Sequence, residues 1–265
     1  MKKSAFFLGA AVAALTAGPA AAADMAVKAA PPVMAPVFSW TGCYLGVHAG
    51  GGATRSSFTS EGSSNDWGNG GLAGGQVGCN YQTGVFVFGV EGEAYWSGMK
   101  VRSEFNQNFI GEGAGGFARS FDEARNKSDY TVAGRIGFTY ERAFIYGKAG
   151  WAWGKFDFGS SNQFSPFGGA EIQTRATLGS GTLNGPLFGV GLEYALTPNW
   201  TVKGEYNYIN YGLSPVDFVN TFCVNPGGCD PAERFSNSVS AEKHLFKFGV
   251  NYLFNVGKNP VVARY

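Results

Sequence analysis

Charged residues are scarce in this chain, and long apolar runs are missing from it. Only 15% of the residues are charged, against about a quarter in an average soluble protein. After the N-terminal stretch, no run approaches the roughly 18 apolar residues that a membrane helix needs. The formal net charge of +1 leaves no basic surface for nucleic acid. The sequence therefore excludes a helical membrane protein and a nucleic-acid binder.

Glycine and aromatic residues are abundant instead. The chain holds 41 glycines among 265 residues, and aromatic residues make up 15%. The glycines show no Gly-X-Y repeat, which excludes collagen, and so many aromatic residues argue against disorder. This composition favours β structure.

The N-terminus has the pattern of an export signal. A basic head, a short apolar run and small residues at the cleavage position predict a signal peptide over residues 1–23. Residues 24–39 carry three prolines and predict an extended periplasmic tether. We expect the folded domain to span 40–254 and a C-terminal extension to cover 255–265.

From Trp40 onward, apolar residues recur at every second position, which is the period of strands. The alternation predicts eight strands, over 40–52, 71–82, 85–98, 130–140, 143–155, 186–196, 200–211 and 243–254. The connections alternate between two or three residues and the long loops 53–70, 99–129, 156–185 and 212–242. Short turns at one end and long loops at the other are typical of outer-membrane barrels. We expect an all-β fold, an eight-stranded antiparallel transmembrane β-barrel with short periplasmic turns and long extracellular loops.

The two faces of these strands differ in charge. The 38 positions that we assign to one face carry no charge. The other face holds four acids and four bases among many glycines: Glu91, Glu93, Arg135, Lys148, Glu193, Lys203, Glu205 and Lys247. Because buried charges persist only when they are paired, this balanced set predicts a polar network in the barrel lumen.

A soluble barrel of the lipocalin kind would invert this arrangement, with charges in water and aromatic residues in the core. Two features favour the membrane. Glycine on the polar face suits a narrow interior better than a solvated surface. Aromatic residues also gather near the strand ends, as interfacial girdles do: Trp40, Tyr81, Trp96, Tyr140, Trp153, Tyr194, Trp200 and Phe254.

Several segments resemble one known family. They are 36–50, 87–93, 134–138, 193–200, 203–206 and 248–252. They resemble the small porin-like outer-membrane proteins of alphaproteobacteria, which include major surface antigens and haemin-binding members. The resemblance implies an eight-stranded barrel in the bacterial outer membrane.

The resemblance also implies a signal for the barrel-insertion machinery. Family members usually end on the aromatic residue of the last strand. In this sequence the corresponding residues are Phe248, Val250, Tyr252 and Phe254, but the 255–265 extension follows them.

Four cysteines in an exported chain permit disulfides. Cys223 and Cys229 enclose a Pro-Gly-Gly turn, which favours a disulfide in the last loop because metal binding would lack partner ligands. Cys43 and Cys79 lie on the outward face near the periplasmic rim. They either form a second disulfide or remain two membrane-facing thiols, because cross-strand geometry is restrictive.

No catalytic set of residues can be assembled from the sequence, and we expect neither an enzyme nor a cofactor or metal site. His48 and His244 are the only histidines. His48 has interior parity and fits a hydrogen-bonding role, whereas His244 lies at the outer end of the last strand. A haem-ligand role for His244 is the less favoured reading.

The favoured function is structural, with display at the cell surface. An eight-stranded barrel is just filled by its side chains, so we expect a plugged or narrow polar lumen. One alternative is a small pore for hydrophilic solutes. Another is a haemin receptor or an adhesin for a host surface that uses loop aromatics, namely Phe105, Phe109, Phe117, Phe164 and Phe167. The expected surroundings are outer-membrane lipid and lipopolysaccharide.

Overall fold

The computed structural model describes residues 38–58, 67–109, 116–166 and 172–254. The chain divides into Met1–Ala35 and Pro36–Tyr265, and every described residue belongs to the second unit. The predicted signal peptide, nearly all of the predicted tether and the predicted 255–265 extension lie outside the described residues. Within the described ranges, no helix is long and apolar enough to cross a membrane.

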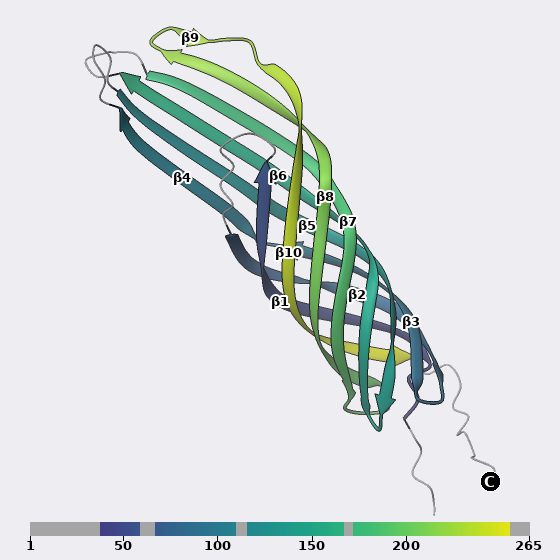
Figure 1. The fold of residues 1–265 in the computed structure, drawn as a ribbon. Helices are drawn as coiled ribbons and strands as arrows, with labels where there is room; N and C mark the ends of the chain where they lie inside the picture. Colours follow the sequence, from purple (N-terminus) through teal and green to yellow (C-terminus); the bar gives the residue numbers. More distant parts are fainter. Residues whose placement is uncertain (1–37, 59–66, 110–115, 167–171, 255–265) are drawn as a thin grey trace, which may run out of the picture. The chain divides into compact units, whose positions relative to one another are not determined.

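The described residues form one antiparallel sheet (Figure 1). Its strands are β1 (Gly42–Phe58), β2 (Trp67–Thr83), β3 (Phe86–Ser97), β4 (Lys100–Phe109), β5 (Gly116–Tyr140), β6 (Ala143–Pro166), β7 (Ile172–Ala195), β8 (Trp200–Asn225), β9 (Gly228–Cys229) and β10 (Glu233–Phe254). β1 pairs with both β2 and β10, which closes the sheet into a barrel. The barrel strands β1, β2, β3, β5, β6, β7, β8 and β10 are the eight predicted from the alternation.

Alternating burial along each strand follows from the pleat of a β-strand, which sends successive side chains to opposite faces. On β3, Glu91 and Glu93 are buried, whereas Val90 is exposed on the outer surface. Three short turns join strands at the periplasmic end, between β2 and β3, β5 and β6, and β7 and β8. Gly84, at the turn after β2, has a φ of +59°, a value that glycine adopts at no steric cost.

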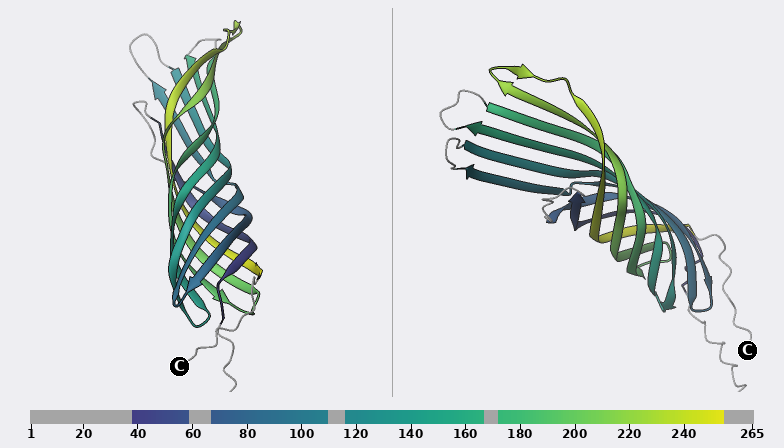
Figure 2. Two further views of the ribbon diagram at one scale, coloured as in Figure 1. Left: turned by 90° about the vertical axis from the view of Figure 1, so that its right-hand side faces the viewer. Right: turned by 45° about the horizontal axis from the view of Figure 1, so that its top comes forward.

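The outer ends of the strands differ from the prediction. Most of the predicted loops 99–129, 156–185 and 212–242 are strand, because β4 to β8 and β10 continue far beyond the barrel. The continuing strands curve away as an open sheet, which Figure 2 shows clearly. Nearer the barrel this sheet keeps a buried apolar face, which includes Phe158, Val216 and Phe218. Farther out, as at 174–180 of β7, both faces are exposed or half-buried, so the sequence there lacks the apolar alternation from which the membrane strands were predicted.

Irregular pairing marks the change from closed barrel to open sheet. Residues 98 and 99 separate β3 from β4, and Met99 accepts a backbone hydrogen bond from Asn126. The β5–β6 register shifts between Asn126 and Ser128, which leaves Lys127 as an extra residue. The β8–β10 register shifts in the same way between Val239 and Ala241. Such bulges bend strands and are common at barrel rims.

Candidate functional site

The interior of the barrel is the candidate functional site. The structure places all eight sequence-predicted charged residues there, each no more than 5% exposed: Glu91, Glu93, Arg135, Lys148, Glu193, Lys203, Glu205 and Lys247. They project from β3, β5, β6, β7, β8 and β10. Strand parity alone was sufficient to find them.

Three lysines and three glutamates form a compact cage in the middle of the barrel. The Lys148 Nζ donates to Glu205 at 2.8 Å and to Glu91 at 3.0 Å. The Lys247 Nζ lies 2.6 Å from Glu93 and 3.0 Å from Glu205. Lys203 completes the cage with a contact of 3.0 Å to Glu91. Each charge therefore meets at least two opposite charges, which offsets the cost of removing it from water.

The cage carboxylates also have the spacing of a cation site. One oxygen from each of Glu91, Glu93 and Glu205 lies within 4.8 Å of the others. The ammonium groups of the three lysines already occupy the space between these oxygens. The arrangement is therefore an ion-pair cluster of the protein's own side chains.

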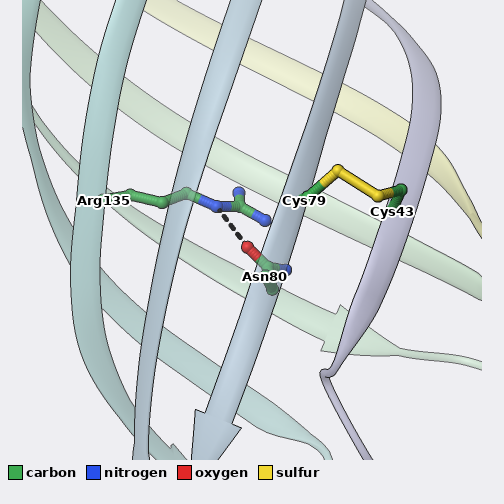
Figure 3. The surroundings of a disulfide bond; sticks show 4 residues. All are labelled: Cys43, Cys79, Asn80 and Arg135. Atoms are coloured by element: carbon green, nitrogen blue, oxygen red, sulfur yellow. Dashed lines mark hydrogen bonds between the residues drawn. A yellow bond between two sulfur atoms is a disulfide. The ribbon is translucent and has the colours of Figure 1, made fainter. Parts of the chain in front are cut away.

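A second ion pair lies on the periplasmic side of the cage. The Arg135 Nη1 is 3.2 Å from Glu193, and the Arg135 Nε donates to Asn80 at 3.0 Å (Figure 3). The guanidinium also lies over the Tyr44 ring, 4.6 Å from its centroid. Tyr44 donates to Glu91 at 2.7 Å and so joins this pair to the cage.

A third ion pair, which was not predicted from the sequence, lies on the outer side of the cage. The Lys243 Nζ lies 2.7 Å from Asp129 and 2.8 Å from the Asn126 side chain. Tyr211 donates to the same Asp129 carboxylate at 2.5 Å. Asp129 falls one residue before the predicted strand 130–140, so extending the same parity by one step would have found it.

Glycines make room for the large interior side chains. A Cβ on Gly78 would lie 2.3 Å from the Tyr44 hydroxyl, and one on Gly191 would lie 2.4 Å from the Tyr146 ring. Tyr146 uses that space to donate to Glu205 at 2.9 Å. The glycines of the polar face are thus a packing requirement of a filled lumen.

Trp40 corrects the sequence prediction that placed it in the interfacial girdle. It is 1% exposed, and its ring packs inside the barrel against Phe144 and Phe38 at 5.3 and 4.9 Å. β1 begins only at Gly42, which has a φ of +149° and approaches the Phe254 carbonyl too closely for a side chain. The residues before this bend therefore enter the barrel. The other seven predicted girdle aromatics are exposed.

Apolar side chains close both ends of the charged region. The Trp40 cluster, which also contains Val87, Phe144 and Ala195, lies at the periplasmic end. A larger apolar cluster surrounds the Lys243–Asp129 pair on the outer side of the cage and includes Leu187, Leu245 and Phe156. The charged side chains are thus sealed between two apolar layers.

Both cysteine pairs are bonded in the structure. Cys43 and Cys79 are direct cross-strand partners on β1 and β2, and their disulfide lies on the outward face (Figure 3). Cys223 and Cys229 join β8 to β9 at the far end of the open sheet. The predicted assembly-signal residues also face outward, with Phe248 73% exposed and Phe254 at the strand end.

Of the described residues of the haemin hypothesis, Phe105 and Phe164 come together in one surface pocket, whereas His244 and Phe117 lie elsewhere. His244 faces outward and contacts the Tyr206 hydroxyl at 2.7 Å. Phe105 and Phe164 lie on one face of the open sheet, whereas the register places Phe117 on the other. Phe167 lies outside the described residues. His48 lies inside the barrel and hydrogen-bonds to Gln76.

Comparison with known proteins decides what kind of barrel this is. The family model described as "outer membrane protein beta-barrel domain" matches residues 10–254. The chain belongs to this family. This outer-membrane barrel therefore lies in the outer membrane of a bacterium, among outer-membrane lipid and lipopolysaccharide.

Relatives of the barrel occur in Brucella and Rhizobium. The 31 kDa outer-membrane immunogenic protein of Brucella melitensis is 34% identical over 266 residues, which cover 92% of this chain and 98% of the relative. The 25 kDa outer-membrane immunogenic protein of Brucella abortus is 29% identical, and the match covers 77% of this chain and 83% of the relative. The 22 kDa outer membrane protein of Rhizobium leguminosarum is 28% identical, with 69% of each chain covered. The predicted alphaproteobacterial family is confirmed.

Solved structures show a more distant likeness. The Ail protein of Yersinia pestis, solved in complex with a heparin analogue, is 15% identical with a TM-score of 0.35. The match covers 79% of this chain and 99% of the Ail chain. Neisserial surface protein A is 16% identical with a TM-score of 0.36, and the match covers 81% of this chain and 98% of that protein. Similarity this low says nothing about function.

Proposed function

We propose that the protein is a sealed structural barrel that anchors an extracellular β-sheet at the cell surface. The single observation that carries this proposal is the filled lumen. The ion-paired side chains of Arg135, Lys148 and Lys203 have no exposed surface, and apolar clusters lie on both sides of them. A solute would have to break these pairs in order to cross.

The outer sheet supports a display role. β4 to β8 and β10 place a large part of the chain beyond the membrane barrel, where other molecules can reach it. The Brucella relatives are named immunogenic proteins, which agrees with exposure of this region at the surface. We propose no catalytic role, because the charged groups of the interior are paired with one another.

The alternative, a small pore, makes the opposite prediction for ion flow. The test is single-channel recording of the refolded full-length protein in planar bilayers. We expect no stable openings from the wild-type protein. A paired variant, R135A/E193A, removes one ion pair without changing the net charge and should begin to conduct if paired side chains form the seal.

One outcome would contradict the sealed barrel. Stable wild-type openings would favour the pore, above all if Arg135→Ala or Glu91→Ala abolished them. The variant K155A serves as the matched control, because Lys155 is exposed on the outside of β6. Its traces should equal those of the wild-type protein.

The outward aromatic residues at the end of β10 support a second, narrower proposal about a partner. Phe248, Val250, Tyr252 and Phe254 present an apolar row on the last barrel strand. We propose that the barrel-insertion machinery recognises this row.

A further inference from the structure

Five basic residues form a patch on the outer surface where β4, β5 and β6 leave the barrel. We define this basic rim patch by its residues, which are all exposed: Lys100, Arg102, Arg125, Lys127 and Lys155. Two acids lie within it. Asp157 is paired with Lys127, and Glu123 is paired with Arg102 at 2.9 Å. Five bases and two acids give the patch a net charge of +3.

The patch lies directly beyond the outer aromatic girdle. On β6, on β5 and across the junction of β3 and β4, an exposed aromatic residue lies on the membrane side of a base. Lys155 follows Trp153 by two residues, Lys127 precedes Tyr130 by three, and Lys100 follows Trp96 by four. At about 3.3 Å per residue along tilted strands, the bases lie ~5–10 Å outside the girdle, at the depth of lipid headgroups.

Positive charges outnumber the acids in this arrangement. Lys100 and Arg125 are direct cross-strand partners on the same face, where like charges destabilise a sheet, and the other cross-strand partner of Arg125 is Asp157, whose carboxylate is paired with Lys127. Among the ion pairs of the described residues, none involves Lys100, Arg125 or Lys155. The bulge at Lys127 adds one more base to this face than regular pairing would allow.

The opposite side of the barrel lacks such a charge excess at the same height. There Arg55 of β1 faces Glu242 of β10 in the register, so the two charges balance. The other cross-strand partner of Glu242 is the uncharged Asn210 of β8. The excess of positive charge is therefore confined to one sector of the rim.

We propose that the basic rim patch binds the anionic headgroup of lipopolysaccharide. The phosphate groups of lipid A lie at the outer-leaflet surface, where each nearby Lys or Arg contributes about 1 kcal/mol of attraction. Trp96 and Trp153 lie below the patch, where they contact the acyl chains, and Lys100, Arg125 and Lys155 supply the unpaired positive charges. The site follows from the location in the outer membrane and does not depend on whether the lumen is sealed.

Native mass spectrometry of the refolded full-length protein in detergent provides the test. The probes are bis-phosphorylated lipid A and the same lipid A after removal of its phosphates. We expect the wild-type protein to bind the phosphorylated lipid on the order of ten- to a hundredfold more tightly than the dephosphorylated one. The variant K100Q/R125Q/K155Q should lose most of that preference.

A matched control distinguishes specific binding at the rim patch from nonspecific electrostatic attraction of the lipid to the protein. The variant R119Q/R175Q/R234Q removes three exposed bases from the open sheet, far from the rim, and should keep the wild-type preference. Equal losses in the two triple variants would overturn the proposal. Equal binding of both lipids by the wild-type protein would also overturn it, without any variant. Heat-modifiable gel mobility confirms that each variant is folded.

Discussion

Lys148 is the interior residue whose substitution should lower the stability of the barrel most. Its ammonium group contacts three carboxylates, those of Glu91, Glu93 and Glu205. Lys148→Met leaves these acids buried with too few partners, which should lower the free energy of unfolding by about 3–5 kcal/mol. Urea unfolding of the refolded protein in detergent measures the change.

A control and a rescue make this prediction specific. Lys155→Met removes an exposed base from the same strand and should change stability by only about 0.5 kcal/mol. The double variant K148M/E205Q restores the charge balance of the interior and should recover much of the loss. If K148M were as stable as K155M, the cage would not hold the barrel together.

At the scale of the strands, the sequence predicts the membrane part well and the outer part poorly. Lipid forces an uncharged face on each barrel strand, so a period of two reveals β1 to β3 and the inner halves of the longer strands. The outer half of β7, with Thr174, Thr177 and Ser180, meets water on both faces, and no such constraint marks it as strand.

Residues at the ends of strands were harder to assign. The parity pattern located the eight charges but stopped short of Asp129 because the predicted strand began one residue later. Trp40 was misplaced for a different reason, since an aromatic residue at a strand end suits both a girdle and a plug. Only the bend at Gly42 distinguishes the two, and that bend depends on its approach to the Phe254 carbonyl.

The two disulfides should differ in their effect on the strands they join. Cys43 and Cys79 are 36 residues apart, whereas Cys223 and Cys229 are 6 apart. A longer closed loop restricts the unfolded chain more, so C43A/C79A should cost about 1–2 kcal/mol more than C223A/C229A. Denaturant midpoints under non-reducing conditions give the comparison. Equal costs would mean that loop entropy does not decide the effect.

At the scale of the whole domain, the closed barrel should fold without the tip of its outer sheet. Gly159 and Leu178 are cross-strand partners on β6 and β7, so an Asn-Gly turn can replace residues 160–177 without changing the register. The shortened protein should keep its heat-modifiable gel mobility, because the barrel closure and the charge cage lie on the periplasmic side of the cut. Loss of that mobility shift would show that the outer sheet is needed for closure.

The charge cage also constrains how the barrel can be assembled. Lys247 and Glu93 meet across a sequence separation of 154 residues, and Lys203 and Glu93 across 110. A partly inserted chain that lacked β10 would leave three cage carboxylates with only two lysines, Lys148 and Lys203, and the uncompensated negative charge would cost several kcal/mol away from water. Translocation of the strands one by one is therefore unfavourable. The strands must associate before they cross the bilayer, and the seam between β1 and β10 closes as the charges leave water together.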